Sequence, residues 1–142
     1  MGTVNNMNYN KALNIRRKQV KIRVYYEDTD AGGIVYHTNY IKYAERARSE
    51  IFFERGMMPS EGEDSGFVIR DLKAGFLATS TLGDMLEVTS KILTLKNSSM
   101  VLLQEIYREE LKVFQMEVTL VYIDKGKPCR IPDKFKAVFA SF

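Results

Sequence analysis

Only one long segment of this chain repeats its apolar residues with a helical period. Over residues 40–52 the apolar side chains recur at three- and four-residue spacing, with charged residues between them. We expect this helix to begin near Thr38 or Asn39, either of which can cap it, and to end at Gly56. Because such a helix has one apolar face, that face must be buried against another element.

The segments around this helix have the composition of strands. Residues 19–26 are β-branched and aromatic, and the acids and paired glycines of residues 27–33 then break the pattern. Four long strand-like segments follow the helix, at residues 66–79, 85–95, 100–108 and 113–123. Pro132 can stand in the first turn of a short terminal helix. The order strand, helix, four strands predicts an α+β fold in which one curved antiparallel sheet covers the helix.

Length and charge predict one domain with a short tail. The chain has 142 residues, the size of one ordinary domain, and 45% of them are apolar. Residues 1–19 carry four of the 21 basic residues and none of the 18 acidic ones, so we expect a flexible tail at residues 1–17 and a single domain at residues 18–142. The remainder holds 17 basic against 18 acidic residues, whereas a nucleic-acid-binding domain carries a basic face. Nucleic acid is therefore not an expected partner.

Apolar run lengths and the cysteine count bear on location and metal binding. The longest apolar runs, such as residues 100–103, are far shorter than the roughly 20 residues of a membrane span, and no signal peptide is visible. The only cysteine, Cys129, cannot form an internal disulfide. With a single histidine as well, the chain offers too few ligands for a zinc site. We expect a cytoplasmic protein without a metal site.

The loop before the helix carries the most specific motif. Residues 25–40 are YYEDTDAGGIVYHTNY, and residues 43–48 continue as YAERAR. This pattern resembles the active-site segment of hotdog-fold acyl-CoA thioesterases of the hydroxybenzoyl-CoA thioesterase type, and within them the bacterial Tol-Pal-associated enzymes. The resemblance extends more weakly from about residue 18 to residue 139. It implies a hotdog fold, in which a curved antiparallel sheet wraps one long helix, assembly into homodimers and usually homotetramers, and no metal or bound cofactor.

Asp30 matches the catalytic aspartate of these enzymes. A carboxylate can attack a thioester carbonyl or take a proton from the attacking water, so the resemblance implies hydrolysis with Asp30 as nucleophile or general base. The substrate would be an acyl-CoA, or the same acyl group on acyl carrier protein. From the residues alone, Asp30 can equally be a turn acid that accepts hydrogen bonds from loop amides.

Two further residues match acid–base positions of the family. His37 stands at the helix entry, where Tol-Pal-associated members have a site histidine and the hydroxybenzoyl-specific enzyme has tyrosine. Its imidazole can transfer a proton, its backbone amide can stabilise the thioester oxygen, or the ring can be purely structural. Glu45 matches an acidic position on the family's helix. It can orient water or a neighbouring side chain, or it can be a solvated helix acid.

Four residues are candidates for substrate binding. Gly33 would let the loop backbone approach the substrate, although tight-turn geometry alone would explain a glycine there. Tyr36 and Tyr40 can line the acyl pocket or belong to the core. Lys96 lies at a bend where the hydroxybenzoyl-CoA enzyme has basic residues, so it is a candidate for the CoA phosphates. Alternatives from the C-terminal end are Lys134 and Lys136.

Two other functions fit the same fold. A hotdog dehydratase or hydratase would use His37 and Glu45 as an acid–base pair, but those enzymes carry histidine in a different local sequence and give Asp30 no role. A non-catalytic protein that binds acyl thioesters is the third possibility.

Overall fold

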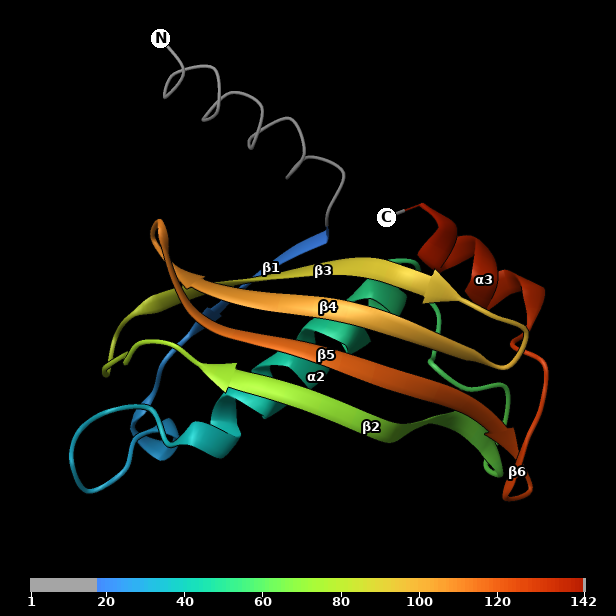
Figure 1. The fold of residues 1–142 in the computed structure, drawn as a ribbon, viewed down its shortest axis with the longest axis horizontal. Coiled ribbons are helices and arrows are strands. Elements are labelled where there is room, and N and C mark those ends of the chain that lie inside the picture. The colour runs from blue at the N-terminus through green and yellow to red at the C-terminus, as the bar shows by residue number, and fades with distance from the viewer. Residues whose placement is uncertain (1–17, 142) are drawn as a thin grey trace, which may run out of the picture.

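A curved antiparallel sheet wraps one long helix in the computed structural model, which describes residues 18–141 (Figure 1). The predicted tail, residues 1–17, and Phe142 lie outside the described residues. The strands are β1 (Lys18–Arg23), β2 (Ser65–Phe76), β3 (Met85–Leu95), β4 (Ser99–Arg108), β5 (Leu111–Asp124) and β6 (Lys127–Pro128). The helices are the 3-10 turn η1 (Tyr26–Asp28), α2 (His37–Phe53) and α3 (Asp133–Ala140). The predicted α+β class and hotdog fold are confirmed.

The strand order places the helix across the whole sheet. Neighbours pair antiparallel in the order β1-β3-β4-β5-β2, and β6 pairs with the end of β5. The strands that precede and follow α2 in the sequence, β1 and β2, therefore lie at opposite edges of the main sheet. The helix crosses from one edge to the other beneath the central strands, so its apolar face is covered along its length (Figure 1).

The core lies between α2 and the concave face of the sheet. Alternate residues of β5 point to this face, and Met116, Val118 and Leu120 are buried there. The helix meets them with a stripe that includes the fully buried Ala44 and Ala47. Because alanine has a small side chain, the sheet can approach the helix closely at these two positions.

A buried polar network also ties α2 to the sheet. Gln104 of β4 is fully buried, and its Nε2 donates to the Ala44 carbonyl oxygen at 2.9 Å and to Ser90 Oγ at 3.0 Å. Its Oε1 accepts a hydrogen bond from Arg48 at 2.8 Å. Burial lowers the pKa of the Arg48 guanidinium. This network fixes the middle of α2 against β3 and β4.

The short helix α3 closes one end of the core with aromatic side chains. The rings of Phe135 and Phe139 contact Phe52 of α2, with centroids 5.4 and 5.5 Å apart. Pro132 stands at the N-cap, immediately before the helix, rather than in its first turn. Neither α2 nor α3, the longer helices of residues 18–141, has the length and apolar character that crossing a membrane requires.

Two expected boundaries at the start of the chain are wrong. The first strand ends at Arg23 because residues 26–28 turn into η1, where the Asp28 carboxylate accepts the Tyr25 N–H at 2.9 Å. The helix begins at His37 with Tyr36 as its N-cap, and no side chain of the described part of the chain caps it. Asn39, which we expected as a capping residue, donates instead to the Asp28 carbonyl oxygen.

Candidate active site

The connection between η1 and α2 folds into a tight loop that carries Asp30. Thr29 and Val35 pair as an antiparallel bridge, and the Asp30 N–H donates to the Ile34 carbonyl oxygen at 2.9 Å. At the tip, the Gly33 N–H donates to the Asp30 carbonyl oxygen at 3.0 Å, and Gly33 has a φ of 83°. This left-handed conformation favours glycine, so the turn itself accounts for Gly33.

The Asp30 carboxylate is exposed to solvent and is held by the loop backbone. Its Oδ1 accepts the Gly32 N–H at 2.8 Å. A Cβ atom at Gly32 would lie only 3.2 Å from this oxygen, so glycine leaves room for the carboxylate to fold back over the loop. With one oxygen held by an amide, the second oxygen is available to accept a proton or attack a carbonyl carbon.

The N-terminus of α2 follows this loop. Among residues 18–141, no acceptor binds the backbone N–H of His37 or Thr38, and the first turn of α2 contains no acidic residue. The start of a 17-residue helix carries partial positive charge and favours an anion. The geometry can therefore stabilise negative charge that develops on a thioester oxygen.

Aromatic rings surround the exposed imidazole of His37. The ring of Tyr36 lies 4.5 Å away and that of Phe76, at the end of β2, lies 5.7 Å away in an edge-to-face arrangement. Within the described residues no hydrogen bond joins this imidazole to Asp30. Phe76 was not predicted as a site residue, because one aromatic residue near the end of a strand gives no sign of contact with a helix 39 residues earlier.

The two candidate pocket tyrosines have different environments. Tyr36 is 47% exposed, whereas Tyr40 is only 3% exposed and stacks on Phe114 with centroids 5.4 Å apart. The Tyr40 hydroxyl donates to Ser80 Oγ at 3.2 Å, and burial raises the pKa of Tyr40. Tyr40 is therefore part of the core in this structure, and Tyr36 is the tyrosine that a substrate can reach.

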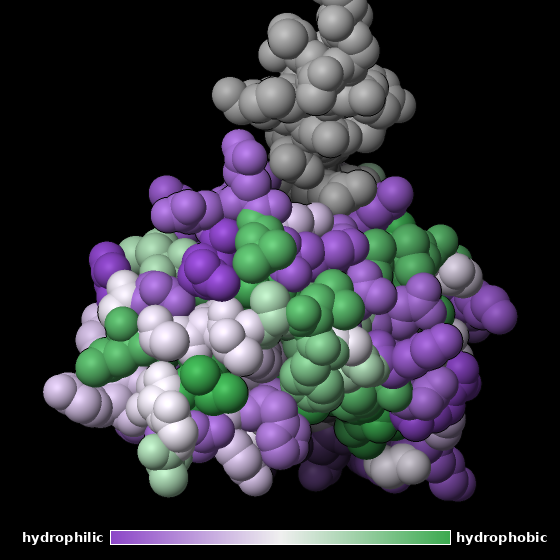
Figure 2. Space-filling model, turned by 60° about the vertical axis from the view of Figure 1, so that its left-hand side comes forward, coloured by the Kyte–Doolittle hydropathy of each residue, from purple (hydrophilic) through white to green (hydrophobic). Residues whose placement is uncertain are grey.

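Exposed aromatic and aliphatic side chains lie on the loops and strand ends around Asp30: Tyr25, Tyr26, Tyr36, Phe76, Leu77 and Leu82. Figure 2 shows a patch of hydrophobic residues on the face turned toward the viewer. Clustered apolar exposure of this kind marks a ligand-binding or protein-binding surface.

Glu45 and Lys96 lie apart from Asp30. Glu45 is two helical turns beyond His37, about 12 Å along the axis at roughly 1.5 Å per residue, and its carboxylate accepts the Ser49 hydroxyl at 2.8 Å. Lys96 follows β3, whose length places it roughly 35 Å along the strand from its start. The Asp30 loop lies near the start of β3, because Ile34 of the loop pairs with Thr81, four residues before that strand.

A groove of about 510 Å³ separates α2 from the edge strand β2. Glu45, Arg48 and Ser49 stand on its helix side, and residues 66–69 form its strand side. Phe52 and Phe139 also line it. Glu45 therefore faces an apolar groove rather than the Asp30 loop.

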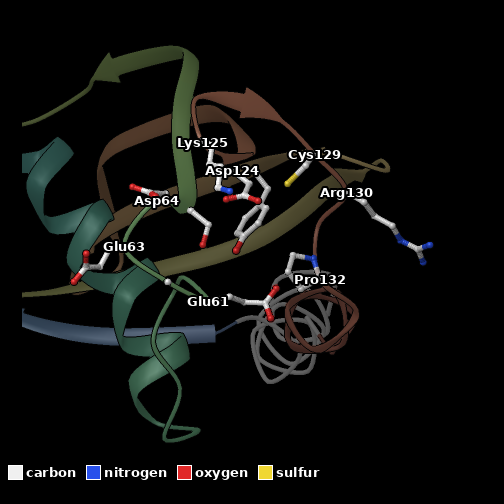
Figure 3. Close-up of a pocket in the computed structure, with 11 residues that line it drawn as sticks. Glu61, Glu63, Asp64, Asp124, Lys125, Cys129, Arg130 and Pro132 are labelled. Carbon is white, nitrogen blue, oxygen red and sulfur yellow. The ribbon is translucent and has the colours of Figure 1, made fainter.

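A polar cleft of about 430 Å³ lies at the other end, beside β6 and α3 (Figure 3). Its basic residues are Lys125 and Arg130, and the Arg130 side chain points away from it. They are outnumbered by the carboxylates of Glu61, Glu63, Asp64 and Asp124. Lys134, an alternative phosphate ligand, pairs with Glu61 at 3.6 Å. This negative charge disfavours CoA phosphates.

Known proteins resemble the chain over most of its length. The family model described as thioesterase-like superfamily matches residues 24–139. The acyl-CoA thioesterase YbgC of Helicobacter pylori strain J99 is 41% identical over 133 residues, which cover 86% of this chain and 99% of that protein. The acyl-CoA thioester hydrolase YbgC of Escherichia coli O6:H1 is 38% identical, covering 83% and 92%.

A solved structure agrees in fold. The probable thioesterase from Bartonella henselae is 30% identical, with a TM-score of 0.73, and the match covers 82% of this chain and 98% of that one. Because the named relatives are thioesterases, the dehydratase and non-catalytic alternatives are not favoured. The chain belongs to the thioesterase-like superfamily, and it is a hotdog-fold acyl-CoA thioesterase.

Proposed function

We propose that Asp30 and the N-terminus of α2 form the site where this thioesterase cleaves acyl-CoA. The observation that carries the proposal is the placement of an exposed carboxylate on a loop that runs directly into a helix start, where the N–H groups of His37 and Thr38 have no acceptor among residues 18–141. The thioester oxygen accepts hydrogen bonds from the backbone at His37 and Thr38. These bonds strengthen as negative charge develops on that oxygen, which lowers the barrier to attack.

Asp30 supplies the other half of the reaction. As a general base it takes a proton from water while the water oxygen attacks the thioester carbonyl carbon. The tetrahedral intermediate then collapses, the carbon–sulfur bond breaks, and the CoA thiolate takes up the proton, which leaves free acid and CoA. As a nucleophile, the Asp30 carboxylate would attack the thioester carbon and expel the CoA thiolate, which takes a proton from solvent, and water would then hydrolyse the resulting anhydride to free acid and Asp30. Single-turnover hydrolysis in ¹⁸O-labelled water identifies the nucleophilic route when water attacks the aspartyl carbonyl carbon of the anhydride, because the product acid then carries an unlabelled oxygen from Asp30.

The substrate is acyl-CoA, and an acyl group on acyl carrier protein is the second form that we propose to test. Tyr36 and Phe76 border the acyl group next to His37, and their exposed apolar surface supports this position. Release of free thiol from short, long and aromatic acyl-CoAs, measured beside the matching acyl carrier protein esters, defines both acyl and carrier preference. A purified chain that releases thiol from none of them would contradict the proposal.

We propose that the working form is a homodimer or homotetramer paired through β2. This strand forms the free edge of the sheet beyond β5, and its exposed residues include Ile69 and Leu72. A long edge strand with exposed apolar side chains favours pairing with another chain. Such pairing would cover the groove between α2 and β2. In the assembly, Glu45 and Lys96 of one copy would approach the Asp30 site of a neighbouring copy.

Light scattering of the purified protein at micromolar concentration is expected to give a dimer or tetramer of the 16.4 kDa chain. The double variant Ile69→Lys with Leu72→Lys is expected to give monomer and to lose most activity, because two charges would lie in the apolar interface. The control Glu110→Lys, on the exposed β4–β5 turn, should keep the wild-type mass. A fully active 16.4 kDa monomer would refute the assembly.

We also propose that the enzyme works in the cytoplasm. The support is its single, free cysteine, the half-buried Cys129, which agrees with a reducing compartment.

A further inference from the structure

We propose that Asn39 is a positioning residue for hydrolysis, because it locks the loop that carries Asp30 onto the first turn of α2. This inference rests on the proposed site. Asn39 is the third residue of the helix and is 8% exposed. Its Nδ2 donates to the carbonyl oxygen of Asp28 at 2.8 Å, across eleven residues of sequence. Its backbone N–H donates to the Tyr36 carbonyl oxygen at 2.8 Å.

The Asp28 carbonyl oxygen is the point where both ends of the loop meet. It accepts the Tyr36 N–H at 2.9 Å as well as the Asn39 side chain. Asp28, which precedes the Thr29–Val35 bridge, is thus hydrogen-bonded to Tyr36, which follows it. Asn39 of the helix is hydrogen-bonded to both residues. Asp30 lies inside this closed segment, two residues from the shared oxygen.

Asp28 is itself held firmly. It is 5% exposed, and its Oδ2 accepts the Tyr25 N–H at 2.9 Å. The fully buried hydroxyl of Tyr43 lies near this carboxylate but outside hydrogen-bond geometry. Burial and the negative charge of Asp28 raise the pKa of Tyr43, so the hydroxyl stays neutral beside the carboxylate. The backbone carbonyl oxygen of Asp28 is therefore held in place at the base of the loop.

This arrangement controls the distance between the Asp30 carboxylate and the first N–H groups of α2, on which the proposed chemistry depends. Asp30 must face the thioester carbon while the N–H groups of His37 and Thr38 donate hydrogen bonds to the thioester oxygen. The only side-chain hydrogen bond between the first turn of α2 and the segment leading to Asp30, within residues 18–141, is that of Asn39. A misplacement of about 1 Å can cost roughly a hundredfold in rate.

The chemistry of the contact requires a side-chain donor. Aspartate has the size of asparagine but presents a second acceptor to the Asp28 carbonyl oxygen, which repels it. Alanine removes the donor, yet it leaves no buried acceptor unpaired, because the Tyr36 N–H still bonds to the Asp28 oxygen. The alanine variant is therefore expected to fold even if the aspartate variant does not.

The test compares Asn39→Asp and Asn39→Ala with Gln104→Met, which breaks the buried hydrogen bonds of Gln104 to α2 at Ala44 and Arg48. Steady-state hydrolysis of an acyl-CoA that the wild type cleaves is measured well below each variant's Tm. We expect both Asn39 variants to lose kcat by about tenfold or more with KM changed by less than about threefold. We expect Gln104→Met to lower Tm as much but to keep kcat within about threefold.

Two results would overturn the positioning role. One is a kcat within about twofold of wild type in both Asn39 variants. The other is an equal kcat loss in Gln104→Met at an equal loss of Tm, which would make Asn39 merely structural. Asp30→Asn is assayed in parallel: if it is fully active, the proposed site itself fails, whereas an inactive Asp30→Asn beside active Asn39 variants removes only the inference about Asn39.

Discussion

Asp30→Asn is expected to lower kcat for acyl-CoA hydrolysis by about a hundredfold or more, with KM nearly unchanged. Asparagine keeps the size of the side chain, and its Oδ1 can still accept the Gly32 N–H that holds the carboxylate at 2.8 Å. The amide cannot take a proton from water, and it cannot attack as a carboxylate does. Thiol release under saturating acyl-CoA gives kcat, and the substrate dependence gives KM.

The matched control is Asp133→Asn, the same exchange at an exposed aspartate of α3, which should keep wild-type kinetics. His37→Ala is informative beside it, because alanine retains the backbone N–H at the start of α2. A smaller loss than in Asp30→Asn favours the backbone role of His37, and an equal loss favours the imidazole. Full activity of Asp30→Asn, in a preparation free of host thioesterase, would remove the basis of the mechanism.

Phe135→Ala is expected to reduce the free energy of unfolding by about 3–5 kcal/mol, the usual cost of truncating a fully buried phenylalanine. Its ring contacts those of Phe52 and Phe67 at 5.4 and 5.9 Å, so its removal leaves a cavity between α2, β2 and α3. The same ring packs 5.8 Å from Tyr122 of β5. Losing it uncouples α3 from the end of the core.

Urea unfolding at one fixed protein concentration measures this loss, because association of the chains would otherwise alter apparent stability. Phe53→Ala is the control, since Phe53 is 47% exposed and its truncation should cost less than about 1 kcal/mol. Equal stability of the two variants would mean that α3 contributes little to the core.

The sheet was predictable because each strand after the helix is long and is bounded by turn residues. The end of the first strand was not predictable, because aromatic residues 25 and 26 favour a strand by composition. A single tertiary feature overrides that preference: the buried Asp28 carboxylate captures the Tyr25 N–H and turns the chain into η1. Local composition does not reveal which acid in the run of Glu27, Asp28 and Asp30 will be buried.

The start of the long helix was predicted wrongly for a related reason. Thr38 and Asn39 are both good capping residues by type, and capping rules assume that the side chain serves its own helix. In the structure the Asn39 amide is used for a contact with Asp28, eleven residues earlier, and Tyr36 takes the N-cap position. A capping pattern cannot distinguish these uses until the preceding loop is folded.

Part of the candidate site could be placed from the sequence, because chain connectivity keeps Asp30, Gly33, Tyr36 and His37 within eight residues of one another. The catalytic and binding roles of these residues stay predictions. Phe76 comes from a strand that reaches His37 only because α2 crosses the sheet to the β2 edge. Sequence spacing likewise could not show that Glu45 and Lys96 lie far from Asp30 in this structure. Their predicted roles now depend on the proposed assembly.

A crystal structure of Asp30→Asn with a non-hydrolysable acyl-CoA analogue, its thioester sulfur replaced by a methylene group, tests the central claim most directly. We predict that the carbonyl oxygen of the analogue accepts a hydrogen bond from the backbone N–H of His37 or Thr38, and that residue 30 lies within van der Waals contact of the carbonyl carbon. A carbonyl group bound out of reach of both, for instance in the polar cleft of Figure 3, would contradict the claim.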